Sequence, residues 1–143
     1  MNWAQKICGL GSKSQQDIGR QGEDAAAAFL QRAGFSLLAR NWRHGRWELD
    51  IVCREKDTIV FVEVKTRSHN TYGGPIAAIT RTKQHILCRA ASAWLTTYHR
   101  WDTPCRFDVI CALKQDDGYH LEHLRHAFDY TPFMDRGRTA WQP

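Results

Sequence analysis

The sequence predicts an α/β fold in which helices flank a central sheet, and three observations support this class. An alanine-rich segment, residues 18–33, is a strong helix former that ends at Gly34. A second helical stripe of apolar residues follows Thr80, a suitable N-cap. Short β-branched segments bounded by turn residues lie between the two helices and after the second one.

We expect the elements in this order: a helix over 18–33, strands over 35–42, 47–54 and 59–67, a helix over 80–98, a strand over 105–113 and a short edge strand over 119–124. Turns are expected at His44–Gly45 and over residues 55–58, where a hairpin joins two strands. The buried stripe of the second helix is expected to contain these residues: Leu87, Ala91, Trp94, Leu95 and Tyr98.

Length and composition set the broad organisation. The 143 residues are enough for one domain with its own core, and the net charge of +5 gives modest support for a polyanionic partner. We expect a flexible N-terminal arm over 1–16, the folded domain over 17–130 and a polar tail over 131–143. The chain has neither a long apolar run nor a signal-peptide core, which predicts a cytoplasmic protein without membrane contact.

Two adjacent predicted strands carry two acids and a lysine. Alternate strand side chains point to the same face, so Glu63 and Lys65 share the face that begins with Ile59 and Phe61. In the preceding strand, strict alternation places Asp50 on the face opposite these residues: Trp47, Leu49, Ile51 and Cys53. The hairpin over 55–58 would bring Asp50 close to Glu63.

These residue types suit the cleavage of a phosphodiester. Hard cations such as Mg²⁺ or Mn²⁺ prefer oxygen ligands, and Asp50 and Glu63 are the candidate metal ligands. Lys65 would steady the attacking water or the negative charge that gathers on the phosphorane oxygens. The alternative is a cross-strand ion pair on a half-buried sheet, which is common and contributes little when exposed.

Five segments occur in order and at natural spacing within residues 17–130: Gly19–Glu23, Arg40–Trp42, Glu48–Asp50, Phe61–Arg67 and Arg106–Val109. They resemble the small bacterial YraN-type (UPF0102) proteins, which are assigned to the PD-(D/E)XK nuclease superfamily. The resemblance implies a restriction-endonuclease-like core, with a central mixed sheet in the order α-β-β-β-α-β. Leu49 departs from the superfamily pattern, because it stands where a proline often precedes the motif aspartate.

The resemblance also implies roles for individual residues. By position, Asp50 is the motif aspartate, Glu63 and Lys65 are the second acid and the lysine, and Glu23 matches the first-helix glutamate of resolvase-like members. The helical stripe would direct Glu23 inward, although a first-turn glutamate can simply complement the helix dipole. Independently of the resemblance, Gln84 lies seven residues before Ala91 and so on the buried stripe of the second helix; it would hold a water or a phosphate, or would be a partly exposed terminal residue.

Cations alternate with aromatic residues around the first predicted turn, which suggests contact with nucleic acid. The candidate contacts are Trp42, Arg43, Arg46, Arg67 and Lys83. Trp42 is either a base-stacking side chain or a core residue.

Together the residues and the resemblance predict a Mg²⁺- or Mn²⁺-dependent nuclease that acts on DNA, with branched or processed DNA among the substrates considered. The alternative is a non-catalytic DNA-binding or adaptor module that keeps the fold. A third hypothesis is that the protein is a protein-interaction scaffold without nucleic-acid affinity. The sequence is compatible with a homodimer.

Overall fold

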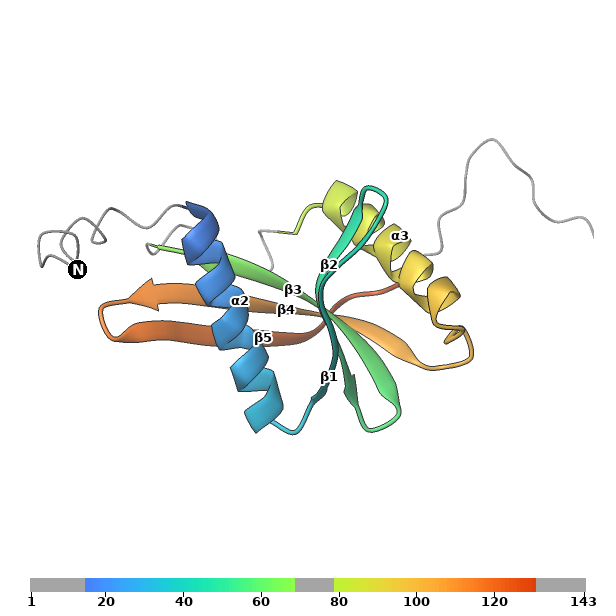
Figure 1. Ribbon diagram of the computed structural model, residues 1–143, viewed down its shortest axis with the longest axis horizontal. Coiled ribbons are helices and arrows are strands. Elements are labelled where there is room, and N and C mark those ends of the chain that lie inside the picture. Colours follow the sequence, from blue (N-terminus) through green and yellow to red (C-terminus); the bar gives the residue numbers. More distant parts are fainter. Residues whose placement is uncertain (1–14, 69–78, 131–143) are drawn as a thin grey trace, which may run out of the picture.

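The computed structural model describes residues 15–68 and 79–130, in which a sheet lies between two helices (Figure 1). Along the chain the elements are α2 (Gln15–Arg32), β1 (Ser36–His44), β2 (Trp47–Glu55), β3 (Thr58–Arg67), α3 (Arg81–Thr97), β4 (Cys105–Gln115) and β5 (Gly118–Phe128). The five strands lie in sequence order, β1-β2-β3-β4-β5. Every neighbouring pair is antiparallel except β3 and β4, which are parallel and joined through α3. The α/β class and the mixed sheet are therefore confirmed, and the arrangement is consistent with a restriction-endonuclease-like core.

Each helix covers one face of the sheet with its own apolar cluster. The cluster under α2 is built around Ala26, Leu30, Ile51, Val60, Val62 and Ile110. The cluster under α3 is built around Leu49, Val52, Phe61, Leu87, Trp94 and Phe107. Both faces of the central strands are thus buried, which explains why β3 is a nearly continuous apolar run. In the part of the chain that the structure describes, neither helix is long and apolar enough to cross a membrane.

The expected helix boundaries follow from their caps. Gly34, with φ of 95°, lies beyond the end of α2, and its amide donates to the carbonyl of Gln31 at 3.1 Å. The next amide, of Phe35, donates to the carbonyl of Leu30 at 3.0 Å, which completes a Schellman motif. At the start of α3, the Thr80 hydroxyl accepts the Lys83 amide hydrogen at 3.1 Å.

Several predicted boundaries are wrong. The first helix begins at Gln15 and not near residue 18, and the first hairpin turn is Gly45–Arg46. The predicted short edge strand extends to Phe128, where the Phe128 ring stacks on Phe107 at 4.6 Å. Tyr98 is 47% exposed because it caps the end of α3 and is not part of the buried stripe. The predicted tail, the predicted loop over 68–75 beyond Ser68, and residues 1–14 of the arm lie outside the described residues.

Gly22 fixes how closely α2 approaches the sheet. A Cβ atom at this position would lie 2.2 Å from the Thr66 hydroxyl oxygen and 2.9 Å from its methyl carbon. Gly19, one turn earlier in the helix, has nothing within 4 Å of an added Cβ. The two glycines therefore form a matched pair, one at a tight contact and one in open space.

We predict that Gly22→Ala destabilises the protein by about 1–3 kcal/mol, because the added methyl overpacks against β3. Gly19→Ala should leave stability unchanged or raise it by up to about 1 kcal/mol through helix propensity. Urea unfolding of both variants provides the measurement. Adding Thr66→Ala to Gly22→Ala removes the two closest atoms and should restore part of the loss. Equal stabilities for the two glycine variants would contradict the close approach.

Candidate active site

The ladder between β2 and β3 ends immediately before the two acids. Backbone pairing runs from Glu55 opposite Thr58 to Ile51 opposite Val62, and the next position in register would be Asp50 opposite Glu63. The Asp50 carboxylate accepts the Val64 amide hydrogen at 2.9 Å. A side-chain oxygen thus satisfies a β3 donor where the backbone ladder with β2 stops.

The strict alternation predicted for β2 is wrong at this point. Leu49 packs in the α3 cluster, whereas Ile51 packs in the α2 cluster, although only Asp50 separates them. On β1, Asn41 lies opposite Asp50 in register and has φ of 48°, a conformation that bends a strand. Because of this irregularity, the Asp50 side chain is not confined to one face of the sheet. Its carboxylate accepts a hydrogen bond from β3, and its charge raises the pKa of Glu23 on α2.

Asp50 and Glu63 form a hydrogen-bonded carboxyl pair. Burial, and next the negative charge of Asp50, raise the pKa of Glu63 to about 7. The pKa of Asp50 is also raised, mainly by burial, against the opposing effect of the Val64 amide and of the hydrogen bond with Glu63. Glu63 is therefore the protonated donor of the pair below about pH 7, and Asp50 is the acceptor.

Two lysines face the same Glu63 oxygen. The Lys65 and Lys83 ammonium nitrogens each lie 3.6 Å from Glu63 Oε1, and the Glu63 side chain is only 9% exposed. Lys65 reaches it along β3, as the two-residue spacing predicted, whereas Lys83 reaches it from the first turn of α3. The sequence predicts Lys83 only as a nucleic-acid contact, and the structure adds its position beside Glu63. The signal for this in the sequence is its place three residues after the Thr80 cap, in the first turn of the helix.

The other predicted site residues have different surroundings. Burial and the charge of Asp50 raise the pKa of Glu23, while a hydrogen bond with Asn41 lowers it. Glu23 is therefore half-buried near the acid pair, on the α2 side. The side-chain amide of Gln84 donates to the backbone carbonyl of Ile79 at 3.4 Å, and Ile79 lies just before the start of α3. That contact turns the amide toward its own backbone.

The candidate DNA contacts lie mainly on the β1–β2 hairpin. Arg43 is exposed and pairs with Glu48 at 3.4 Å. The Arg46 guanidinium lies 4.6 Å from the centre of the Trp47 ring. Trp42 is half-buried against the α3 cluster and stacks on His44, with ring centres 5.8 Å apart. Arg67 is exposed at the end of β3.

The donor set fits a hard divalent cation in its chemistry. Two carboxyl groups converge, both have raised pKa values, and a cation would favour the ionised form of each. Within residues 15–68 and 79–130 no three His, Cys, Asp or Glu side chains gather closely enough to hold a metal together. Asp50 and Glu63 would therefore need phosphate or water oxygens to complete the ligand set, as is usual for Mg²⁺.

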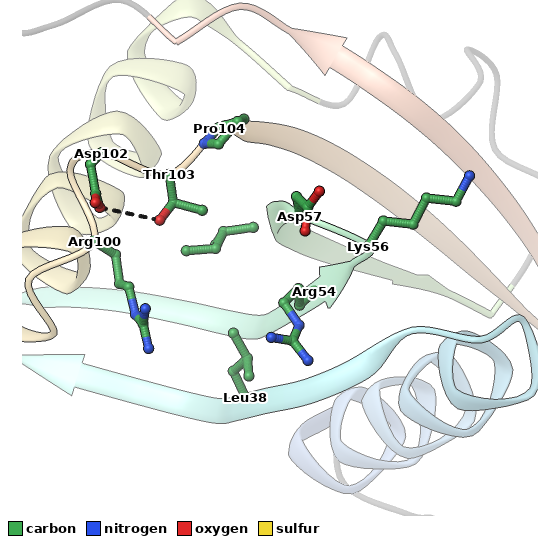
Figure 2. A pocket seen from close by; sticks show the side chains of 9 residues that line it. Leu38, Arg54, Lys56, Asp57, Arg100, Asp102, Thr103 and Pro104 are labelled. Atoms are coloured by element: carbon green, nitrogen blue, oxygen red, sulfur yellow. Dashed lines mark hydrogen bonds between the residues drawn. The ribbon is translucent and has the colours of Figure 1, made fainter.

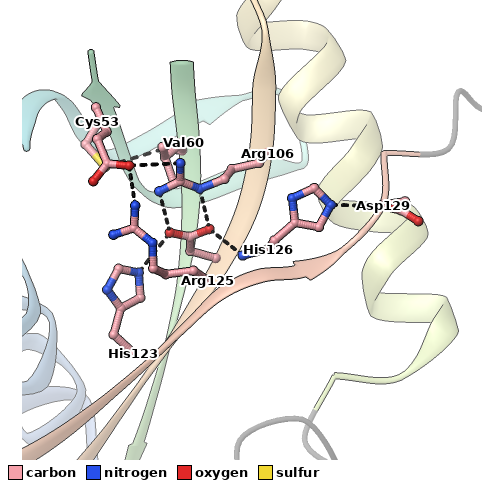
Figure 3. A network of polar contacts seen from close by, with 9 residues as sticks. Cys53, Val60, Arg106, His123, Arg125, His126 and Asp129 are labelled. Atoms are coloured by element: carbon pink, nitrogen blue, oxygen red, sulfur yellow. Dashed lines mark hydrogen bonds and ion pairs between the residues drawn. The ribbon is translucent and has the colours of Figure 1, made fainter. Parts of the chain in front are cut away.

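A second polar network lies on the α2 side of the sheet and includes Arg106 and His123 (Figure 3). Its central acid is the buried Asp108. Its carboxylate accepts hydrogen bonds from Arg106 at 3.0 and 3.2 Å, from His123 at 2.8 Å and from the His126 amide at 2.9 Å. Burial alone would raise the Asp108 pKa, but these donors lower it. Because the network satisfies the acid and ties β5 to β4, we interpret it as structural.

Comparison with known proteins identifies the family. Residues 22–112 match the model described as "Uncharacterised protein family UPF0102". A UPF0102 protein from Nitratidesulfovibrio vulgaris is 52% identical over 125 residues, which cover 87% of this chain and 93% of the relative. The chain belongs to the UPF0102 family.

Other UPF0102 relatives match over a similar length. The Lawsonia intracellularis protein is 43% identical over 89% of this chain and 96% of its own length. The Geobacter sulfurreducens protein is 43% identical over 85% of this chain and 95% of its own length. The family match contains every candidate site residue from Glu23 to Gln84 but ends before β5. The family description and the relatives' names state no activity, so activity must be argued from the site.

The raised pKa of Glu63 predicts a pH-dependent stability. Between its ordinary value of 4.5 and about 7, the folded state binds the Glu63 proton and the unfolded state releases it. Stability from neutral Glu63 is thus fully present below pH 4.5 and is lost as pH rises through about 7. In EDTA, Glu63→Gln should exceed the wild type in unfolding free energy by up to about 3 kcal/mol at pH 8 and should match it near pH 4.5.

Urea unfolding at both pH values checks this prediction. The exposed Glu122→Gln is the control, and its difference from wild type should be small at both pH values. A Glu63→Gln difference that does not change with pH would show that Glu63 ionises normally in the folded protein.

Proposed function

We propose that this UPF0102 protein is a Mg²⁺- or Mn²⁺-dependent nuclease that hydrolyses DNA phosphodiester bonds. The observation that carries the proposal is the desolvated pair of Asp50 and Glu63 beside two ammonium groups. A buried acid pair that must share a proton costs stability, and such pairs are concentrated at functional sites. The neighbouring basic hairpin supports a polyanionic substrate.

The acids and Lys65 would have different roles in the reaction. Asp50 and Glu63 would hold the cation, which supplies positive charge to the phosphate and activates water when bound. The Val64 amide, which donates to the Asp50 carboxylate at 2.9 Å, would orient Asp50 for this role. Lys65 would donate a hydrogen bond to the attacking water or to a nonbridging phosphate oxygen, where negative charge grows in the transition state.

Lys83 would have a different role from Lys65, in binding the substrate and not in the chemical step. It lies as close to Glu63 as Lys65 does, but it is 39% exposed at the N-terminal turn of α3. It would bind a substrate phosphate and help Glu63 to ionise. Glu23, near Asp50 on the α2 side, would hold a water and position it within the site.

A non-catalytic DNA-binding or adaptor module is the second candidate. The absence of a three-member acid, His or Cys cluster in the described residues favours it, because two lysines and two carboxyl groups can hold a phosphate without cutting it. The two candidates differ in whether the acids bind a cation and whether Lys65 affects the chemical step.

We predict that Asp50→Asn and Glu63→Gln each abolish Mn²⁺ binding while the sheet remains folded, because each removes a carboxylate ligand. Titration calorimetry with Mn²⁺ is the measurement. Asp116→Asn, an exposed carboxylate in the β4–β5 turn, is the matched control and should bind like the wild type. Equal binding heats in all four proteins would reject Asp50 and Glu63 as ligands.

We predict that Lys65→Met lowers single-turnover cleavage by about a hundredfold or more at saturating DNA, the scale for loss of one electrostatic stabiliser. Lys83→Met removes a charge at the same distance from Glu63, so it is a matched comparison. It should weaken DNA affinity while cleavage at saturation falls by less than about tenfold.

The substrates tested should include linear, nicked, flapped and four-way DNA, each with Mg²⁺, Mn²⁺ or EDTA. Full cleavage by Lys65→Met would remove Lys65 from the chemistry. DNA binding without cleavage of any substrate by the wild type would support the adaptor candidate.

A further inference from the structure

A cavity of about 310 Å³ lies beside the β2–β3 turn, away from the acid pair. Figure 2 shows side chains that line it. The β2–β3 hairpin contributes Arg54 and Asp57, and the connection from α3 to β4 contributes Arg100 and Thr103. Arg54 is four residues from Asp50 along β2, which corresponds to roughly 13 Å of strand. The cavity is therefore separate from the candidate active site.

Two arginines face this cavity, and neither has a partner among the residues that the structure describes. Within the described part of the chain, the Arg54 and Arg100 side chains make neither an ion pair nor a hydrogen bond, although two carboxylates line the same cavity. In Figure 2 their guanidinium groups flank the space beside Leu38, while the Lys56 side chain extends away from it. Two guanidinium groups with unused donors are suited to bidentate contact with a phosphate.

Arg100 is held in position by the end of α3. Its amide donates to the carbonyl of Leu95 at 2.9 Å, and the His99 amide donates to Thr96 at 3.4 Å, which is the Schellman pattern. His99 has φ of 54°, the left-handed conformation that this ending requires. The Thr103 amide then donates to the Arg100 carbonyl at 3.1 Å. The backbone that presents Arg100 is thus fixed before any ligand binds.

The apolar wall of the cavity is also shaped by an irregular backbone feature. The register of β1 against β2 shifts between Leu37 and Ala39, which makes Leu38 the bulged residue. Leu38 is 45% exposed and lines the cavity together with Ile59. Bulges often change the direction of a side chain beside a binding site, and this one places the apolar Leu38 side chain on the wall of the cavity.

The size and lining define the class of ligand. The volume equals about ten water molecules, which is more than inorganic phosphate needs and lies at the lower end of small-molecule sites. The apolar wall suits a flat or apolar body. The Asp57 carboxylate can accept from hydroxyl or amino groups, and so can the Thr103 hydroxyl oxygen, whose hydrogen is donated to Asp102 at 3.4 Å.

We propose that this cavity binds a phosphorylated small molecule of nucleotide size. Arg54 and Arg100 hold the phosphate, Leu38 contacts the base, and Asp57 and Thr103 hydrogen-bond to the sugar. The same chemistry is presented by a free nucleotide and by the 5′-phosphorylated end of a nucleic-acid strand. The site goes beyond the proposed nuclease function and does not depend on the acid pair.

The test is titration calorimetry of the full chain in EDTA with adenosine 5′-monophosphate, adenosine and inorganic phosphate as separate probes. We expect adenosine 5′-monophosphate to bind at one site, with adenosine and phosphate each at least about tenfold weaker. Arg54→Ala and Arg100→Ala should each weaken its binding by about tenfold or more, the scale for a charged hydrogen bond.

The control is Arg20→Ala with Arg32→Ala, which removes two exposed charges on α2 and should leave binding unchanged. Asp50→Asn should also leave it unchanged, so failure of the nuclease proposal would not affect the result. Tighter binding of a short oligothymidine with a 5′-phosphate than with a 5′-hydroxyl would identify a strand end as the source. Equal oligothymidine binding, with adenosine 5′-monophosphate still bound, would identify the free nucleotide.

Two results would overturn the proposal. One is the absence of adenosine 5′-monophosphate binding to the wild type. The other is binding that Arg54→Ala and Arg100→Ala do not weaken more than the control on α2 does.

Discussion

The candidate site depends on the hydrogen bond from the Val64 amide to the Asp50 carboxylate, at 2.9 Å. Here β2 leaves the ladder with β3, and a side-chain oxygen accepts the donor that the strand no longer pairs. The bond holds Asp50 beside Glu63 in a largely buried position, where burial raises the pKa of both acids and they share a proton below about pH 7. If the ladder continued in register, the pleat alone would set the direction of the Asp50 side chain.

The sheet contains two kinds of buried acid, which differ in their hydrogen-bond partners and in the direction of their pKa shifts. Asp108 accepts hydrogen bonds of 2.8 to 3.2 Å from three residues, and its pKa is lowered. Glu63 has two ammonium groups at 3.6 Å, beyond close hydrogen-bond distance, and its pKa is raised. A fully hydrogen-bonded acid such as Asp108 holds strands together, whereas a cation would stabilise the ionised form of a desolvated carboxyl pair. The two acids also lie under different helices. On one face of the sheet α2 packs closely at Gly22, and on the other face α3 places Lys83 beside Glu63.

Much of the site was accessible to sequence reasoning because strand geometry is local. The alternation of β3 correctly placed Glu63 and Lys65 on the face of Phe61, and the 55–58 hairpin correctly joined β2 to β3. The same rule failed at Leu49 and Ile51, because the departure at Asp50 involves Asn41 on a third strand. Lys83 was grouped with surface cations, since a helix pattern cannot say which strand residue its first turn will meet. The cavity between Arg54 and Arg100 joins segments that no local pattern relates.

The sequence by itself determined the α/β class, the order of the described helices and strands, the helix caps at Gly34 and Thr80, and membership of the UPF0102 family. These follow from propensity, periodicity and short-range hydrogen bonding, which act within a few residues of the chain. Only the tertiary structure decided that Asp50 and Glu63 are hydrogen-bonded to each other, that Lys83 joins them, and that Asp108 is tied to β5. Desolvation and charge pairing depend on the distance between distant segments after packing, and that distance is absent from any local sequence pattern.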